Sequence, residues 1–577
     1  MEFRPERTHC PDCGVLLTVR KTRTRIVNTL HVGHFRAREV FLSCNSCGQT
    51  QRSEALGALV PPGANFGYDV MVHAGKALFL RHRNETEAVA ELALKNVRIS
   101  PREVSLLGMK FIVYLALAHQ RRVSALHADM QTRGGYICHL DATCEGRDPF
   151  LMSSLDSLSN IVLGNVKLPA EDEAHIVPFL ERLRQAFGVP LALVHDMGSG
   201  ILKAVAKVFP GVADFICHFH FLRDIGKDYL GAEYDTIRTR LNRHGIGTTL
   251  RYRAKQLKRE MDANPGMSNA LQCGMENATL PPAAAALTPV VGAYTLIQWA
   301  LNAKTEGDGY GFPFDRPHLA FAQRLQRLNT HIERIKDIHL RGQWKDNIPY
   351  LKIHLALMPI MKDQALGKAI AVLETKITVF EKLRKAMRIA RPAGSCGLND
   401  EGRTENIHTI AKRIEAFRAW LTRRQDYPQD RAAGKMIEQI DKYWNKLFAD
   451  PITVQTISGP ILIQPQRTNN ILEQFFRSIK RAHRRRTGNA SSSRMLRTIL
   501  AETPLIRNLE NPHYMQILLN GKPSIEAVFA EIEIDTLRKA FREAQDDPER
   551  IPAKLKTIIA MPDFPEKLVN MVEKAVA

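Results

Sequence analysis

The sequence predicts a multidomain α+β protein, and three observations support this prediction. The chain has 577 residues, which is long enough to form several domains with separate cores. Two pairs of closely spaced cysteines, with alternating polar and apolar residues between them, predict a small β-rich module at the N-terminus. Strand patterns return after Gly135, whereas about 250 residues between His220 and Glu473 show mainly helical patterns, too many for a loop in a compact domain.

The composition points to nucleic acid or another anionic surface as a partner. The chain holds 81 Lys+Arg against 60 Asp+Glu, which gives a formal net charge of +21. No stretch approaches the ~20 apolar residues of a membrane span, and residues 1–10 lack the apolar core of a signal peptide. The nine cysteines are unevenly spaced, unlike those of a secreted disulfide framework. We therefore expect a cytoplasmic protein with no membrane partner.

Residues 1–55 are predicted to form a zinc ribbon. The motifs Cys10-Pro-Asp-Cys13 and Cys44-Asn-Ser-Cys47 are two C-x2-C pairs, and four thiolates can bind one structural Zn²⁺ ion tetrahedrally. The alternating polar and apolar residues 38–43 suit a strand of such a ribbon. Redox chemistry is the alternative use of a C-x2-C pair, but that chemistry does not need a second matched pair.

Residues 56–130 are predicted to be helical and to form a helix-turn-helix-like DNA-binding region. Asn84 can cap one helix, and Ser100 followed by Pro101 is the start signal of another. Two helices joined by the short turn 95–99 can form a helix-turn-helix. A plain helical pair gives the same pattern, and the basic charge of the chain favours DNA reading only slightly.

Residues 131–225 have the element order of an RNase H-like α/β domain. Three strand patterns are followed by a helix (171–187), a strand, a second helix and a last strand that reaches Phe219. Asp141 ends the first strand and Asp196 ends the fourth. In an RNase H-like sheet these two strands are neighbours, so we expect the two aspartates side by side.

A third acid, Glu473, begins a basic helix in residues 461–494, the predicted second part of the same domain. Three carboxylates at one corner can hold two Mg²⁺ or Mn²⁺ ions about 3.5–4 Å apart. Glu145, Asp148 and Asp156 are alternative ligands, although turn formation is the commoner reason for acids at such positions. The basic side chains after the acid are predicted to bind DNA: Arg477, Lys480, Arg481, Arg484, Arg485 and Arg486. Taken alone, this run is equally typical of a solvated helix with one salt-bridged Glu.

Four motifs follow one another along the chain: Leu140-Asp141-Ala-Thr, His195-Asp196-Met-Gly-Ser-Gly-Ile, Cys217-His-Phe-His220 and Thr468-Asn-Asn-Ile-Leu-Glu473. In this order they resemble the motifs of DDE transposases, in the group of Mutator-like elements and related bacterial insertion sequences. The resemblance implies that Cys217 and His220 match a C-x2-H signature and support the active site, with a hydrogen bond from His220. Two ligands alone cannot close a tetrahedral zinc site.

The resemblance also gives an expectation for the rest of the chain. Residues 226–460 are predicted to form an all-helical insertion, as in Mutator-like and hAT transposases, and residues 495–577 a helical C-terminal region. Trp299 precedes a Gly-rich segment, and some related transposases stack an insertion-domain aromatic on a flipped base, so we expect Trp299 to contact DNA. A core Trp on an amphipathic helix is the alternative.

The function implied by the resemblance is that of a transposase of a bacterial mobile element. It would bind element ends and carry out metal-dependent strand cleavage and strand transfer on double-stranded DNA, with Asp141, Asp196 and Glu473 as metal ligands. Because two ends must be joined, we expect a homodimer or higher oligomer on DNA. The alternatives are a catalytically silent zinc-ribbon and helix-turn-helix DNA-binding regulator derived from a transposase, and a structure-selective nuclease on the same fold.

Overall fold

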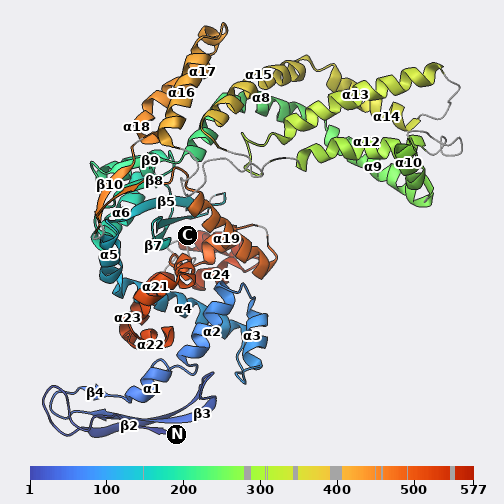
Figure 1. Ribbon diagram of the computed structural model, residues 1–577. Helices are drawn as coiled ribbons and strands as arrows, with labels where there is room; N and C mark the ends of the chain where they lie inside the picture. The colour runs from blue at the N-terminus through green and yellow to red at the C-terminus, as the bar shows by residue number, and fades with distance from the viewer. Residues whose placement is uncertain are drawn as a thin grey trace.

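The computed structural model describes residues 1–146, 148–264, 266–277, 288–305, 307, 309–341, 348–389, 406–448, 450–456, 459–489, 491–545 and 553–576. Over these residues the chain is a mixed α+β protein with three small sheets, which confirms the predicted class. Figure 1 shows a β-rich N-terminal module at the bottom, a layer of helices above it, a central sheet, and long helices that extend from the top.

The N-terminal module is a small sheet with four cysteines near one end. Two long strands form an antiparallel hairpin and two short strands pair with the second of them: β1 (Glu2–Phe3), β2 (Thr18–Asn28), β3 (His34–Ser43) and β4 (Thr50–Gln51). One face of the hairpin carries Val27, Phe35 and Ala37, which pack against Leu56 of α1 (Glu54–Leu59). This apolar contact fixes which face of the hairpin is turned inward.

A layer of four helices follows: α2 (Tyr68–Phe79), α3 (Glu85–Ala93), α4 (Pro101–Arg121) and α5 (Val123–Thr132). The predicted helix starts are confirmed, because Asn84 and Glu87 form a capping box before α3 and the Ser100 side chain accepts a hydrogen bond from the Glu103 N–H before α4. The local sequence specifies these starts, since each cap satisfies main-chain N–H groups that have no partner inside the helix.

The long helix α4 lies at the centre of this layer. Its predicted apolar stripe is buried, with Leu107 the most exposed member at 4% and Val104, Phe111 and Leu115 fully covered. α2 and α3 pack on it from the N-terminal side, and helices from the C-terminal region pack on it as well. Its apolar stripe therefore belongs to the core, while Arg102 near its N-terminus stays exposed, and a DNA-reading role for this helical pair stays a prediction.

The central sheet has five strands: β5 (Ile137–Thr143), β6 (Phe150–Asp156), β7 (Ile161–Leu168), β8 (Ala192–His195) and β9 (Ala213–Ile216). Their order is β7-β6-β5-β8-β9, so the first and fourth strands are neighbours, as predicted. Helices α6 (Glu173–Phe187) and α7 (Ser199–Val208) connect the later strands. The last strand ends at Ile216 and not at Phe219, because Cys217 is already the N-cap of the next helix.

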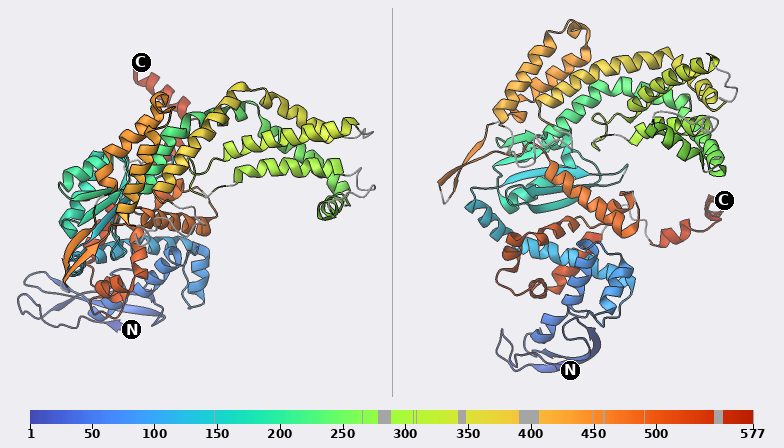
Figure 2. Two further views of the ribbon diagram at one scale, coloured as in Figure 1. Left: turned by 45° about the horizontal axis from the view of Figure 1, so that its top comes forward. Right: turned by 45° about the vertical axis from the view of Figure 1, so that its right-hand side comes forward.

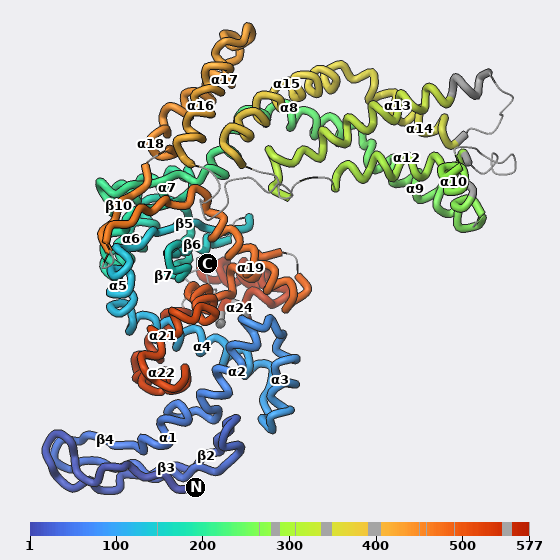
Figure 3. The backbone as a smooth tube through the Cα atoms, in the orientation of Figure 1, coloured from blue at the N-terminus to red at the C-terminus, as the bar shows by residue number. Residues whose placement is uncertain are grey.

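Between the sheet and its second part the chain is mainly helical, as predicted. The helices are α8 (His218–Arg243), α9 (Ile246–Ala263), α10 (Gly266–Asn277), α12 (Thr288–Asn302), α13 (Pro317–Arg341), α14 (Ile348–Met361), α15 (Gln364–Ala386), α16 (Ile407–Thr422), α17 (Arg431–Lys442) and α18 (Trp444–Leu447). All of them except α10 contribute to one shared hydrophobic core. Figure 3 shows two arms, one that contains α8 to α15 and a shorter one made by α16 and α17.

A strand hairpin within the last part of this region was not predicted. β10 (Ile452–Thr456) and β11 (Gly459–Ile463) are antiparallel, although residues up to 460 were expected to be helical. Ile452 and Ile463 pack against the central sheet near Ile137 and Val194. The hairpin therefore belongs with the sheet, and β-branched residues on both of its strands are the sequence signal for it.

The remaining residues are helical and start with α19 (Asn470–Thr487). The elements after it are α20 (Ser493–Thr498), η3 (Thr503–Glu510), α21 (Pro512–Leu519), α22 (Ile525–Ala530), α23 (Ile534–Gln545), α24 (Ala553–Ile559) and α25 (Phe564–Val576). η3, α22 and α23 contact α4, whereas the C-terminal end of the chain projects away from the body in the right-hand view of Figure 2. Among the described helices, none combines the length and the apolar character that crossing a membrane requires.

Candidate active site

Asp141 lies within β5, two residues before its last residue, and Asp196 directly follows the neighbouring parallel strand β8, so the prediction that Asp141 ends its strand was wrong by two residues. β5 and β8 pair in a register that places His139 opposite Val194, and each aspartate stands two residues further along the chain. Asp141 is buried, and this burial, together with the negative charge of Asp196, raises the pKa of Asp141. The Asp196 carboxylate also accepts a hydrogen bond of 2.9 Å from the Gly198 N–H, which fixes the turn after the strand.

Glu473 joins this corner from the first turn of α19. α19 packs against β5, and the charge of Glu473 is a further cause of the raised pKa of Asp141. The Glu473 side chain is 22% exposed, so the site is accessible from solvent. The structure thus brings together the three acids that the sequence predicted, from segments more than 250 residues apart.

Asn469, the N-cap residue of α19, ties the helix to the strand that carries Asp141. Its side-chain amide donates a hydrogen bond of 2.6 Å to the Leu140 carbonyl, and its side-chain oxygen lies 2.9 Å from His139 Nδ1. Its main-chain N–H donates to Cys217 Sγ at 3.1 Å. Asn469 is fully buried, so these bonds form in a low-dielectric environment, where an unmade bond is costly.

Cys217 links the strand that carries Asp196 to the same network. Its main-chain N–H donates a hydrogen bond of 2.7 Å to the carbonyl of His195, and its sulfur receives the N–H of Asn469. Burial raises the pKa of the Cys217 thiol, so the group stays protonated. These contacts give Cys217 a positioning geometry, and the supporting role that the resemblance implies stays a prediction.

His220, one turn into α8, lies beside Glu473. Its Nε2 is 3.3 Å from Glu473 Oε1, which makes a close polar contact rather than a hydrogen bond of normal length to a charged oxygen. Burial, together with the charges of Arg223 and Lys227, lowers the pKa of His220 to about 3. The ring is therefore neutral near pH 7 and adds no positive charge to the site.

Glu171 is a fourth acid of this corner, and the sequence analysis placed it inside a helix. α6 begins at Glu173 with Asp172 as its N-cap, so Glu171 lies in the loop before it. Burial and the charge of Asp196 raise the pKa of Glu171 to about 7. Its main chain lies close to α7, since a Cβ at Gly200 would come within 2.4 Å of the Glu171 carbonyl oxygen. The cap at Asp172 is the sequence signal that could have placed it correctly.

The chemistry of this acidic corner suits hard divalent cations, which prefer carboxylate oxygens. Burial and mutual repulsion hold the pKa of Asp141 well above its usual range, and a bound cation would offset both effects. Within the described part of the chain, only the N-terminal cysteines form a group whose ligand atoms all lie within 4.8 Å of one another. The carboxylates of the acidic corner are therefore not a group of ligand atoms that all lie within this distance.

The three alternative acidic ligands have other partners. Asp156 accepts hydrogen bonds from the main-chain N–H groups of Ile137, Leu158 and Ser159, which is the turn role that was the alternative. Glu145 accepts from Ser491 and Ser492, and Asp148 pairs with Arg497. These contacts hold the segment after β5 against the segment after α19.

The predicted DNA-binding residues lie along α19 beyond Glu473. Arg477, Arg481, Arg484 and Arg485 are exposed, whereas Lys480 and Arg486 are half-buried. The charge of Lys480 lowers the pKa of Glu145, and the Arg486 guanidinium lies 5.9 Å from the centre of the Phe79 ring. The exposed cations form a positive surface that begins at the acidic corner.

Trp299 lies within the helical insertion and not at the acidic corner. Its ring is half-buried against the insertion core, and the guanidinium groups of Arg324 and Arg327 lie 4.9 and 5.1 Å from its centre. Arg324 also donates a hydrogen bond to the Trp299 carbonyl. A base could stack on this ring only after the two cations moved, so the contacts favour the core-packing alternative.

The four N-terminal cysteines form a compact cluster: Cys10, Cys13, Cys44 and Cys47. The Cys13 and Cys44 sulfurs are 3.3 Å apart, and those of Cys10 and Cys47 are 3.5 Å apart. Sulfurs of a tetrahedral zinc site, at about 2.3 Å from the ion, would be ~3.8 Å apart. Each knuckle closes by a hydrogen bond of 2.9 Å from Gly14 or Gly48, both at positive φ, to the carbonyl of its first cysteine. The cluster could therefore hold a metal ion.

Comparison with known proteins adds no further assignment. No protein-family model matches the sequence, and no curated protein is significantly similar to it.

Proposed function

We propose that this protein is a DDE-type DNA transposase of a bacterial mobile element, with an RNase H-like catalytic domain interrupted by the helical insertion. One observation supports this most strongly. Asp141 near the end of β5 and Asp196 just after β8 lie on neighbouring strands, and α19 carries Glu473 to the same corner from beyond the insertion. An acidic corner next to a helix of exposed arginines suits a phosphodiester substrate held by its phosphates.

The three acids would hold two Mg²⁺ or Mn²⁺ ions, which stabilise the attacking and leaving oxygens of a phosphodiester when bound. In the first step, water attacks the phosphorus at an element end; a new P–O bond forms and the 3′-oxygen leaves as a hydroxyl. In the second step, this 3′-hydroxyl attacks target DNA and the 3′-oxygen of the target strand leaves. Asn469 and Cys217 keep α19 against β5, and neutral His220 lies beside the Glu473 carboxylate.

The remaining parts of the proposal concern recognition. Cys10, Cys13, Cys44 and Cys47 would hold one Zn²⁺ ion that stabilises the N-terminal ribbon. The partner is double-stranded DNA, both element ends and target, and the formal net charge of +21 supports it. Two ends must be joined, so we propose at least a homodimer on DNA.

The test is cleavage of duplexes that contain the DNA flanking the coding region, with the full-length chain in Mg²⁺ or Mn²⁺. Asp141→Asn, Asp196→Asn and Glu473→Gln should each abolish cleavage without loss of thermal stability, because each removes a like charge from a crowded site. Asp148→Asn is the matched control, since its partner is Arg497 and not the acidic corner.

Three results would contradict the proposal. Cleavage at the wild-type rate by Asp196→Asn would show that the metal site is wrong. Cleavage of branched DNA by the wild type without any preference for the flanking DNA would indicate a structure-selective nuclease. Binding of the flanking DNA with no cleavage in either metal would indicate a DNA-binding regulator.

A further inference from the structure

The outer face of the β2–β3 hairpin is a solvent-exposed surface that the proposed chemistry does not use. We define it by side chains that all point away from α1: Thr22, Thr24, Ile26, His34, Arg36 and Arg38. Thr24 pairs with Arg38 and Ile26 with Arg36, so these four form two adjacent cross-strand pairs. All six are exposed, and Ile26 is 48% exposed although β-branched apolar residues normally pack.

The hairpin is basic, and its acidic charge is hidden. Residues 18–43 contain six basic side chains and one acid: Arg20, Lys21, Arg23, Arg25, Arg36, Arg38 and Glu39. Glu39 is 3% exposed and pairs with Arg25 at 3.7 Å and Arg52 at 2.9 Å on the inner side. On the outer face, Arg38 lies 3.5 Å from Glu2 of β1, yet 62% of its side chain stays exposed. Of the six basic side chains, Arg36 and Arg38 lie on the outer face, and their positive charge complements a polyanion.

The hairpin is a two-stranded ribbon from its turn to about Ala37, and residues 1–3 add a short third strand beside Arg36 to Glu39 of β3. The major groove of B-DNA, about 12 Å wide, admits a two-stranded β-ribbon. Alternate residues of a strand are about 6.6–6.8 Å apart, which is close to two base-pair steps of about 3.4 Å. In Figure 1 the hairpin lies at the edge of the molecule, with α1 on its inner side only. The outer face is exposed from His34 to Arg38, whereas the next two residues on this side of β3 are covered: Val40 is 3% exposed and Leu42 packs on the cysteine cluster.

We propose that the outer face of the β2–β3 hairpin enters the major groove of duplex DNA and reads its sequence. Arg36 and Arg38 can each donate two hydrogen bonds to guanine O6 and N7, and the methyl groups of Thr24 and Ile26 can contact thymine methyls. The inner side packs on α1, so the strands are held rigidly while their outer side chains contact bases. α4, the other candidate for reading DNA, has its apolar stripe buried in the core.

Two basic residues on the opposite side of β2 provide a matched comparison. Lys21 lies 5.0 Å from the centre of the Phe41 ring, and Arg23 points toward the loop at Gly63. Lys21→Ala with Arg23→Ala removes two charges from the hairpin, as does Arg36→Ala with Arg38→Ala. Both double variants should bind random duplex more weakly by similar factors, because phosphate contacts depend on charge. Only the outer-face variant should lose sequence preference.

This inference deepens the proposed function and rests on it for the choice of DNA as the ligand. The experiment incubates the full-length protein with a pool of duplexes that carry 30 randomised base pairs, recovers the bound fraction and sequences it. Fluorescence anisotropy at two salt concentrations then compares the enriched duplex with a scrambled one. A parallel pool of single-stranded RNA tests the other class of nucleic acid. The double variant Arg36→Lys, Arg38→Lys keeps both positive charges, so a loss of sequence preference in it is not caused by lost charge. Zinc content and melting temperature are measured for all variants to show that they are folded.

We expect the wild type to enrich a sequence that contains guanines, with about a 5- to 150-fold preference lost for each arginine replaced by alanine or lysine. The Lys21→Ala, Arg23→Ala variant should keep the enriched sequence. The inference is overturned if the outer-face variants keep the wild-type preference, if the wild type enriches no DNA sequence, or if it prefers the RNA pool. Sequence preference without cleavage would refute the proposed catalysis but would still support sequence recognition by the outer face of the β2–β3 hairpin.

Discussion

Replacing Asn469 by alanine tests whether the start of α19 positions Glu473. The change removes two side-chain hydrogen bonds, to the Leu140 carbonyl at 2.6 Å and with His139 Nδ1 at 2.9 Å. The partners are buried and would lose their bonds without gaining water. An unsatisfied buried group costs about 1–3 kcal/mol, so the free energy of unfolding should fall by about 2–6 kcal/mol. α19 would then no longer be tied to the strand that carries Asp141.

Asn508→Ala is a close control for the stability effect. Asn508 is also fully buried, and its side chain makes two hydrogen bonds of 2.8 Å with the main chain of Val162. Its loss should lower the free energy of unfolding by a similar amount, because it has the same number of buried bonds. Asn508 belongs to η3 and its side chain bonds to Val162 of β7, away from the acidic corner. Cleavage by the folded Asn508→Ala protein should therefore not change.

The assay compares the two variants at a temperature where urea denaturation shows both to be folded. Cleavage of the flanking DNA is measured over a range of Mg²⁺ concentrations. We expect Asn469→Ala to need more Mg²⁺ for half-maximal cleavage and to cleave at least tenfold more slowly than Asn508→Ala, since misplaced catalytic groups lower the rate by such factors. Equal cleavage by the two variants would refute the positioning role and leave Asn469 as a packing residue.

Three further predictions concern other sites. Cys44→Ser, or removal of zinc by a chelator, should unfold the ribbon, because a module this small depends on its metal. The reactivity of the remaining cysteine thiols measures the unfolding. A variant that keeps its sequence preference on DNA would contradict the prediction. Burial lowers the pKa of His119 to about 4, so the unfolded chain binds more protons between pH 6.5 and 4 and stability falls as the pH falls through that range. The difference between the ordinary His pKa of 6.5 and the value of about 4 in the folded protein corresponds to about 3 kcal/mol of unfolding free energy. In His119→Gln the unfolding free energy should therefore depend less steeply on pH between 6.5 and 4. The same slope in the variant and the wild type would refute this prediction. Glu171→Gln removes a negative charge from beside Asp196, so half-maximal cleavage should need several-fold more Mg²⁺, whereas an unchanged requirement would exclude Glu171 from the site.

Features that depend on local sequence could be predicted. The caps at Asn84 and Ser100 satisfy N–H groups within the next turn, and the structure has both. The placement of Asp141 and Asp196 on neighbouring strands followed from the order of the elements, although β5 continues two residues beyond Asp141. The paired cysteines were recognisable because metal ligands need short, fixed spacings.

Features that depend on distant contacts could not be predicted in the same way. The burial of α4 comes partly from C-terminal helices about 400 residues away, for example through Phe529, whose ring stacks on Tyr114. The hairpin β10–β11 is stabilised by the sheet on which Ile452 and Ile463 pack, and in isolation a two-stranded hairpin is marginal. Glu171 belongs to the acidic corner only because the neighbouring loop brings it to Asp196.

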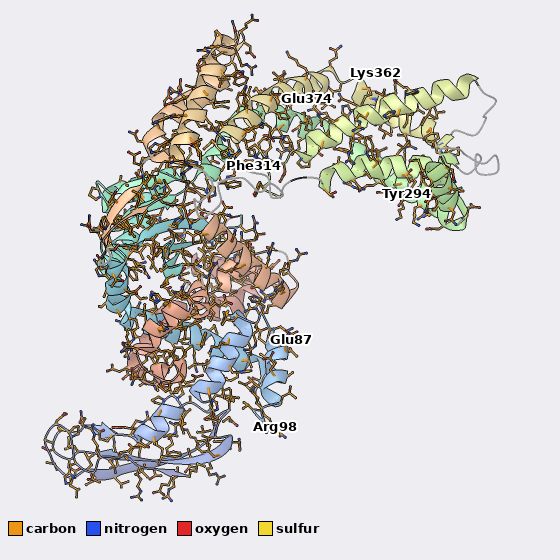
Figure 4. The ribbon with its side chains drawn as sticks, in the orientation of Figure 1. Glu87, Arg98, Tyr294, Phe314, Lys362 and Glu374 are labelled. Atoms are coloured by element: carbon orange, nitrogen blue, oxygen red, sulfur yellow. The ribbon has the colours of Figure 1, made fainter. Side chains whose placement is uncertain are left out.

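The helical insertion and the acidic corner share a structural element, which explains how a region of about 250 residues can interrupt the domain without separating its acids. α8 begins at His218 beside the corner and continues for 26 residues into the insertion. Phe219 stacks on Phe314 of the insertion at 4.9 Å and 11°, and Figure 4 shows Phe314 where the insertion meets the sheet. A Cβ at Gly226 would come within 2.4 Å of Pro313, so the insertion packs directly on the helix backbone. His220 follows Phe219 on this helix, so any tilt of the insertion that moves the stacked ring also moves the side chain beside Glu473.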